Sequence, residues 1–274
     1  MKIFIDSAKL HEIEQAYSYG ILDGVTTNPS LLKGAVDDLS KKGDSISLEE
    51  YIKKILVTAK GTPVSLEVTE YDYDGMVSQA KQLFKRFNPV AKNVVIKIPV
   101  NTSFPGESGN DFEGLKAIKT LTQQNIPVNC TLIFTPEQAL LAAKAGATYV
   151  SPFVGRIDDY LRSSKDISFD KIDYFPAEGM FFEDIVLHDE GIISGIDLVA
   201  QIVDIFSVYD LKTQVLAASI RNTRQVRESA LAGADIATLP FKVISQLMAH
   251  YKTQEGMQKF TDDIVPEYVA LTQE

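Results

Sequence analysis

Eight short apolar segments alternate with amphipathic segments along the 274 residues, and this order predicts an α/β fold, a closed (β/α)₈ TIM barrel. Strict alternation implies parallel strands, and this number of repeats in a chain of this length favours closure. The rival, a doubly wound open sheet, lacks its usual phosphate fingerprint, because no Gly-x-Gly-x-x-Gly follows a predicted strand. We therefore expect a single domain over residues 1–274. It would carry insertions near residues 33–47, 100–114 and 158–191 and an extra C-terminal helix.

The predicted strands are rich in Val, Ile and Phe and end at polar, Gly or Pro residues. They span residues 2–6, 24–28, 64–68, 93–99, 128–134, 148–154, 214–219 and 236–240. Between them, apolar residues at helical spacing, such as Leu10, Ile13 and Tyr17, predict helices. The predicted helices span residues 8–19, 48–59, 73–87, 112–124, 136–146, 198–209, 225–232 and 242–250. Polar loops are expected at residues 36–47, 101–110 and 158–190, the last with ten acidic and three basic residues.

The tail after the last repeat, residues 254–271, also carries apolar side chains at helical spacing, with Pro266 as an expected kink. The stripe consists of Met257, Phe260, Ile264, Tyr268 and Leu271. Such a stripe needs a covering surface, which is either the barrel or a neighbouring subunit.

The composition excludes several classes of function. A net charge of −10 argues against nucleic acid as a main partner, because a phosphate backbone needs a basic surface. Cys130 is the single cysteine, so no internal disulfide forms and a reducing, cytoplasmic location is expected. The first residues do not resemble a signal peptide, and no apolar run has transmembrane length. The histidines, at positions 11, 188 and 250, do not cluster, so no metal site is expected.

One lysine, Lys97, lies inside the apolar strand at residues 93–99. An ammonium group buried without a partner is unfavourable, and a neutral amine there is a usable nucleophile. The alternative is that Lys97 reaches the end of the strand or pairs with a carboxylate. The strand alone does not distinguish these two interpretations.

Polar residues near the C-terminal ends of seven predicted strands favour the catalytic interpretation, because barrel enzymes carry their chemistry at those ends. They are Asp6, Thr26, Asn28, Ser65, Glu67, Lys97, Asn129, Thr131, Ser151 beside Phe153, and Ser219, with Arg156 and Arg221 just beyond two of the strands. A single buried polar residue is usually explained by packing, but polar residues at the ends of seven strands are hard to explain in that way.

The residue types indicate roles. Lys97 is the strong amine candidate, so a Schiff base with a carbonyl substrate is the natural reaction. Asp6 and Glu67 can exchange protons with a hydroxyl or water, or instead pair with lysines. Arg156 and Arg221, with Ser219, form a plausible anion clamp, since guanidinium groups suit phosphate. The alternative for either arginine is a salt bridge to one of the 37 acidic residues.

Seven motifs resemble the transaldolase family, in particular its short bacterial and archaeal branch, related to the fructose-6-phosphate aldolases. The motifs are Phe-Ile-Asp at 4–6, Gly-Val-Thr-Thr-Asn-Pro-Ser-Leu at 24–31, Ser-Leu-Glu-Val at 65–68, Val-Ile-Lys-Ile-Pro at 95–99, Asn-Cys-Thr-Leu-Ile-Phe at 129–134, Ala-Gly-Ala-Thr-Tyr-Val-Ser-Pro-Phe-Val-Gly-Arg-Ile-Asp at 145–158 and Ala-Ala-Ser-Ile-Arg-Asn at 217–222. They stand in family order and cover most of the chain outside the insertions.

The resemblance implies a transaldolase of the pentose phosphate pathway. Such an enzyme moves a dihydroxyacetone unit from fructose 6-phosphate or sedoheptulose 7-phosphate to an aldose phosphate, without metal or organic cofactor. Lys97, on the fourth strand, would form the Schiff base, and Asp6 would act on the C4 hydroxyl. Glu67 and Thr131 would hold a proton-shuttling water. The remaining residues would bind substrate, with Asn28 and Asn129 on hydroxyls, Thr26 and Ser151 nearby, and Arg156, Ser219 and Arg221 on the phosphate.

The sister aldolases cleave the ketose without an acceptor sugar, and they carry Gln, Tyr and Tyr where this chain has Glu67, Phe134 and Phe153. All three positions resemble transaldolase. We hypothesise that the phenylalanines keep the carbanion from being protonated. A third alternative is a non-catalytic sugar-phosphate-binding barrel, since fold alone does not give function.

The chain departs from the family pattern in two loops. Residues 100–114 are longer than usual, and the acidic segment 158–190 is expected over the barrel mouth or at a subunit contact, or else as a solvated surface excursion. Because of these loops, the sequence does not identify the acceptor substrate. An anion other than phosphate, such as a sulfonate, could bind the same clamp. Short family members are often pentamers or decamers, so the resemblance also implies a homo-oligomer.

Overall fold

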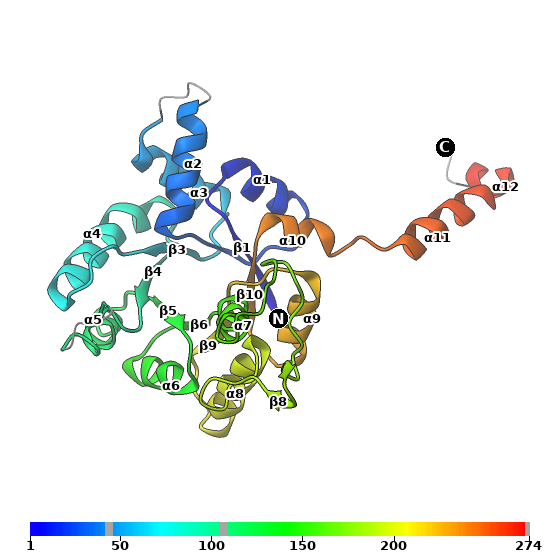
Figure 1. Ribbon diagram of the computed structural model, residues 1–274. Helices are drawn as coiled ribbons and strands as arrows, with labels where there is room; N and C mark the ends of the chain where they lie inside the picture. Colours follow the sequence, from blue (N-terminus) through cyan, green and yellow to red (C-terminus); the bar gives the residue numbers. More distant parts are fainter. Residues whose placement is uncertain (42–45, 105–108, 272–274) are drawn as a thin grey trace.

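Eight parallel strands close a barrel in the computed structural model, which describes residues 1–41, 46–104 and 109–271 (Figure 1). The barrel strands, in chain order, are β1 Lys2–Asp6, β2 Gly24–Thr26, β3 Val64–Glu67, β4 Val94–Pro99, β5 Val128–Ile133, β6 Tyr149–Pro152, β9 Gln214–Ala217 and β10 Ile236–Leu239. Each strand pairs with the next along the chain, and β10 closes on β1. The predicted (β/α)₈ barrel is confirmed.

Helices separate the strands and surround the barrel (Figure 1). They are α1 Leu10–Ser18, α2 Pro29–Lys41, α3 Leu48–Thr58, α4 Tyr73–Ala91, α5 Glu113–Thr122, α6 Pro136–Ala145, α7 Val154–Ser163, α8 Gly195–Val208, α9 Thr223–Leu231 and α10 Phe241–Gln246. The main core lies between the strands and these helices. A smaller cluster fills the barrel interior, with Phe4, Val95, Tyr149, Leu216 and Ile236 among its members. Because this interior is packed, the chemistry is confined to its open end.

Local sequence signals explain the ends of helix α6. Thr135 accepts from the N–H of Gln138, and the Gln138 side chain accepts from the N–H of Thr135, which is a capping box. Pro136 occupies the first turn, where its missing N–H has no intrahelical partner to lose. Gly146 ends the helix at φ +100°, a conformation that glycine adopts without strain.

Three of the expected loops begin or end differently in the structure. The loop expected from residue 36 is wrong up to Lys41, because α2 continues to that residue; residues 42–45 lie outside the described residues. Residues 113–114 belong to α5, and residues 105–108 of the second loop are not described. The acidic segment starts later than expected, because residues 158–163 complete α7 and bury Ile157 and Leu161. The helical spacing of these apolar residues favours a helix here, although the surrounding sequence is acidic.

The remainder of the acidic segment, residues 164–190, is anchored to the barrel's outer helices and includes the small hairpin of β7 Phe181–Phe182 and β8 Ile185–Val186. Buried Arg162 donates to the carbonyls of Asp173 and Tyr174. The Tyr174 hydroxyl donates to Glu228 of α9 at 2.7 Å. Phe175 is buried. The segment is therefore anchored at these points, while many of its other residues are exposed to solvent.

The C-terminal tail forms two helices, α11 Tyr251–Asp262 and α12 Pro266–Ala270, which extend away from the barrel (Figure 1). Pro266 begins α12, so the expected break at this proline is confirmed. None of the described residues of the two helices is buried. The apolar stripe of the tail is thus left uncovered by its own barrel. No helix in the described ranges is long and apolar enough to span a bilayer.

Candidate active site

A pocket of about 410 Å³ opens at the carboxyl ends of the barrel strands. Nine residues predicted from the sequence line it: Asp6, Thr26, Asn28, Glu67, Lys97, Ser151, Phe153, Arg156 and Ser219. Residues that the sequence prediction missed also line it: Pro29, Ser30, Leu31, Leu132, Leu216, Ala218 and Thr238. Six different strands, or the segments that directly follow them, therefore contribute predicted side chains to one cavity.

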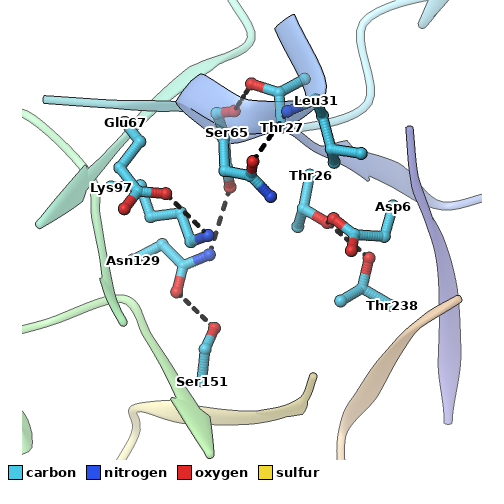
Figure 2. Close-up of polar contacts among 11 residues, drawn as sticks. Asp6, Thr26, Thr27, Leu31, Ser65, Glu67, Lys97, Asn129, Ser151 and Thr238 are labelled. Carbon is cyan, nitrogen blue, oxygen red and sulfur yellow. Dashed lines mark hydrogen bonds and ion pairs between the residues drawn. The ribbon is translucent and has the colours of Figure 1, made fainter. Parts of the chain in front are cut away.

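Lys97 reaches the pocket from the middle of β4, on the inner face of the barrel above Val95. Its amine lies 2.9 Å from Oε2 of Glu67, the neighbouring residue on β3 (Figure 2). The Lys97 side chain is only 8% exposed. The sequence allowed either a reactive lysine or one paired with a carboxylate. In the structure Lys97 is paired with Glu67 and also faces the cavity.

Asp6 lies across the pocket from Lys97 and is held by Thr26, which in turn contacts Thr238 (Figure 2). The Thr26 hydroxyl donates to Oδ1 of Asp6 at 2.7 Å and lies 2.6 Å from the hydroxyl of Thr238. Burial raises the pKa of the Asp6 carboxyl, while Lys97, the Thr26 hydrogen bond and Arg156 oppose that rise. A carboxyl with a raised pKa exchanges protons more readily near neutral pH, as a general acid or base requires.

Asn129 lies beneath the pocket rather than in its wall. Its Nδ2 donates to the Ser65 hydroxyl at 3.2 Å, and its Oδ1 accepts from Ser151 at 2.7 Å (Figure 2). It is fully buried, whereas Ser151 lines the cavity. Asn129 therefore orients Ser151 toward the pocket from below.

Asn28 joins the pocket to the first turn of α2. Its Oδ1 accepts from the N–H of Leu31 at 2.9 Å, as an N-terminal cap does. This leaves the amide nitrogen of Asn28 to face the cavity as a hydrogen-bond donor. The sequence Asn28-Pro29 thus stops β2, starts α2 and positions a polar side chain in one step.

Aromatic and apolar residues form one wall of the pocket. The rings of Phe134 and Phe153 meet edge to face with centroids 5.7 Å apart. Arg156 lies over the Phe153 ring, 4.9 Å from its centroid. Leu132 points into the cavity from an irregularity in β5, where its φ is +59°. A branched residue in this region is strained, and such strain is concentrated at functional sites.

The two arginines of the expected clamp differ. Arg156 is exposed and lines the pocket beside Ser219. Arg221 is not among the lining residues, because both of its terminal nitrogens bind the carboxylate of Asp159 at 2.6 Å. Its Nη1 also donates to the carbonyl of Lys171 at 3.2 Å. The salt-bridge alternative therefore holds for Arg221, and the acidic segment supplies part of its support.

The turn that carries Ser219 is packed tightly against α7. Ser219 has a φ of +59°, and its carbonyl accepts from the N–H of Gly155 at 3.1 Å. A Cβ at Gly155 would lie 2.5 Å from that carbonyl oxygen, so only glycine permits this approach. The sequence Phe153-Val154-Gly155-Arg156 thereby places the Phe153 ring and the Arg156 side chain on either side of this close contact.

Thr131 is fully buried and does not line the pocket. Within the described part of the chain, its hydroxyl has no hydrogen-bond partner. Oε2 of Glu67 is likewise buried without a well-aligned hydrogen bond to any described residue, although it forms the ion pair with Lys97. Buried polar atoms of this kind are usual contacts of ordered water.

Thr238 is a polar residue on a barrel strand that the sequence prediction missed. It lies on β10 two residues after Ile236, so it shares an inward face with that core residue. The rule that residues two apart on a strand share a face was used to select Thr26 and Glu67. The same rule applied to the last strand would have selected Thr238. Among the described residues, no group of three or more His, Cys, Asp or Glu side chains lies close enough to hold a metal ion.

Comparisons with known proteins agree with this geometry. A family model described as transaldolase/fructose-6-phosphate aldolase matches residues 3–272. A protein of Thermoplasma acidophilum named "Probable transaldolase" is 42% identical over 263 residues, covering 96% of this chain and 95% of that protein. One of the same name from Caldicellulosiruptor saccharolyticus is 43% identical over 264 residues, covering 96% of each chain.

A solved structure with a similar fold is a lactate oxidase, described as putative, from Pediococcus acidilactici. It has a TM-score of 0.50 and 12% sequence identity, and the match covers 90% of this chain and 65% of that one. At this identity the likeness concerns the fold alone.

Proposed function

The chain belongs to the transaldolase/fructose-6-phosphate aldolase family, and we propose that within this family it acts as a transaldolase. It transfers a dihydroxyacetone unit from fructose 6-phosphate or sedoheptulose 7-phosphate to an aldose phosphate, in the pentose phosphate pathway. The observation that carries the proposal is the amine of Lys97, paired with Glu67 and facing Asp6 across one pocket. Relatives above 40% identity that are named probable transaldolases support it.

The proposed reaction begins when the neutral amine of Lys97 attacks the C2 carbonyl of the ketose and water leaves, giving a Schiff base. Asp6 then takes the proton of the C4 hydroxyl. The C3–C4 bond breaks, its electron pair passes into the protonated Schiff base, and an aldose phosphate departs. The resulting enamine attacks the acceptor aldehyde, and Asp6 returns its proton to the new hydroxyl.

Glu67 and Thr131 are proposed to hold the water that moves protons while the Schiff base forms and hydrolyses. Two buried oxygens support this role: the Thr131 hydroxyl, which has no hydrogen-bond partner among the described residues, and Oε2 of Glu67, which is paired with Lys97. Asn28, Thr26 and Ser151 are proposed to bind hydroxyls of the three-carbon unit, since all three line the pocket. Asn129 acts on that unit through Ser151, because Ser151 donates to its carbonyl oxygen.

The phosphate is proposed to bind Arg156 and Ser219 directly. Both line the pocket on the same side, and Arg156 has no carboxylate partner among the described residues. Arg221 is proposed to support this site from behind, because both of its terminal nitrogens are bound to the carboxylate of Asp159. The phosphate therefore meets one guanidinium group and one hydroxyl, rather than the clamp of two arginines and Ser219 that the sequence suggested.

We also propose that the protein is a homo-oligomer, a pentamer or decamer, in which the tail contacts a neighbouring copy. The uncovered apolar residues of α11 and α12 support this, since Phe260 and Tyr268 are 70% and 69% exposed.

The test of the proposed activity is turnover of fructose 6-phosphate with and without erythrose 4-phosphate, measured as glyceraldehyde 3-phosphate in a coupled assay. A transaldolase releases product at a substantial rate only with the acceptor. Release at the same rate without the acceptor would make the protein an aldolase of the sister group. No release under either condition, with either ketose, would favour a non-catalytic sugar-phosphate-binding barrel.

A further inference from the structure

A buried pair of threonine hydroxyls leads from β10 to the acid/base carboxylate of Asp6. The Thr238 hydroxyl lies 2.6 Å from that of Thr26, which lies 2.7 Å from Oδ1 of Asp6 (Figure 2). Thr26 is 2% exposed and Thr238 is 3% exposed. Both line the pocket, yet so little of either side chain is exposed that removing one hydroxyl leaves the other without its protein partner.

The order of donors in this chain follows from counting protons. An ionised carboxylate only accepts, so Thr26 must donate its single hydroxyl proton to Asp6. The Thr26 oxygen is then an acceptor in its contact with Thr238, and Thr238 must donate. Donation by Thr238 polarises the Thr26 O–H bond and strengthens its hydrogen bond to Asp6.

We propose that Thr238 is a positioning residue for Asp6, whose hydroxyl fixes the direction of the Thr238–Thr26–Asp6 chain and stabilises the ionised carboxylate. This inference rests on the proposed role of Asp6 as the base that accepts the C4 hydroxyl proton. Thr238 itself touches no reacting atom in that role. It keeps Asp6 in the form that can accept a proton.

The charged groups around Asp6 act in the same direction as the threonine chain. Lys97 of β4 and Arg156 of α7 both favour the ionised form, and Glu67 of β3 is paired with Lys97. Burial opposes them by raising the pKa of Asp6. The neighbouring strands β2 and β10 contribute uncharged hydroxyls, Thr26 and Thr238, to this balance. Removing one of them therefore shifts the balance toward the protonated carboxyl.

The test is Thr238→Val, which keeps the shape of the side chain and removes its donor. Thr238 does not touch the carboxyl, so its loss weakens the Thr26–Asp6 hydrogen bond without removing it, and the Asp6 titration is expected to move to higher pH by about a few tenths of a pH unit. Two readouts report it: the acidic limb of the kcat/KM profile, and the ¹³C titration of the Asp6 carboxyl in aspartate-labelled protein, assigned with Asp6→Asn. Thr238→Ser restores both to the wild-type positions.

The matched control is Thr27→Val, which removes another buried threonine hydroxyl next to the site. Thr27 donates to the carbonyl of Ser65 at 2.7 Å and takes no part in the chain to Asp6. The control is expected to leave the Asp6 titration in place. A shift as large in Thr27→Val as in Thr238→Val would overturn the inference.

An unchanged Asp6 titration in folded Thr238→Val would also overturn it, and Thr238→Ala serves as the second variant if the valine protein does not fold. The carboxyl titration needs no turnover. Failure of the wild-type enzyme to process fructose 6-phosphate would therefore refute the proposed activity while the position of the Asp6 titration still decides the role of Thr238.

Discussion

Asp158 provides a prediction about how the stability of the fold depends on pH. It follows Arg156 and Ile157 on α7 and is 3% exposed. Its Oδ1 accepts from the N–H of Gly195 at 2.7 Å, and its Oδ2 accepts from Gln225 at 2.9 Å. Gln225 in turn accepts from the N–H of Arg221, so the buried carboxyl supports the turn that carries Ser219.

Burial raises the pKa of the Asp158 carboxyl to about 7 from its ordinary value of 3.8, against the opposing effect of its hydrogen bonds and of Arg162. The folded state therefore binds this proton more tightly than the unfolded chain does. The resulting stabilisation is fully present below pH 3.8 and is lost as the pH rises through about 7. Between pH 5 and pH 8, at about 1.4 kcal/mol per unit over the two units below the folded pKa, the loss is about 3 kcal/mol.

Urea unfolding of the wild type and of Asp158→Asn across this pH range measures the effect. The asparagine variant retains the carbonyl oxygen for Gly195 but has no group that titrates, so its stability curve should lack the decline. The difference between the two free energies of unfolding should change by about 3 kcal/mol from pH 5 to pH 8. Parallel curves for the two proteins would refute the reasoning, because other carboxyls such as Asp6 titrate in both.

Three further predictions follow from the same geometry. Phe153→Tyr puts a hydroxyl beside the carbanion and should raise acceptor-independent cleavage of fructose 6-phosphate, measured in the coupled assay; no gain would count against the role of the aromatic wall. Asp159→Ala should destabilise the fold by about 2 kcal/mol in urea, because Arg221 loses a two-point partner in a mostly buried site, whereas Lys212→Ala, which removes an exposed pair, should have little effect. Removing residues 251–274 should reduce the particle mass in light scattering to that of one chain; an unchanged oligomer would exclude the tail as the contact.

The sequence predicted the barrel because the strand and helix periods are strong along the whole chain. Lys97 was identifiable because a lysine in an apolar strand is rare, and Asp6 and Glu67 because strand ends converge in a barrel. The boundaries of α2 and α7 were not predicted, since polar surface residues hide their helical spacing. The identity of the partner of Arg221 could not be read from spacing, because Asp159 and a phosphate offer it the same oxygen pair.

Thr238 illustrates a different limit. The sequence could predict that Thr238 faces the barrel interior. It could not predict the contact with the Thr26 hydroxyl, which lies 212 residues away in the chain. Asn129 shows the same dependence, because its place beneath Ser151 follows from the register of β5 with β6. Contacts across the barrel arise from tertiary packing, which strand patterns do not encode.

The most direct test of the central claim is reduction of the protein with borohydride in the presence of fructose 6-phosphate, followed by mass spectrometry of its peptides. A Schiff base intermediate predicts one stable three-carbon adduct on Lys97 and none in Lys97→Met. Another of the lysines, such as exposed Lys212, serves as an internal control and should remain unmodified. An adduct on a different lysine, or none on a protein that turns over the sugar, would contradict the assignment of Lys97.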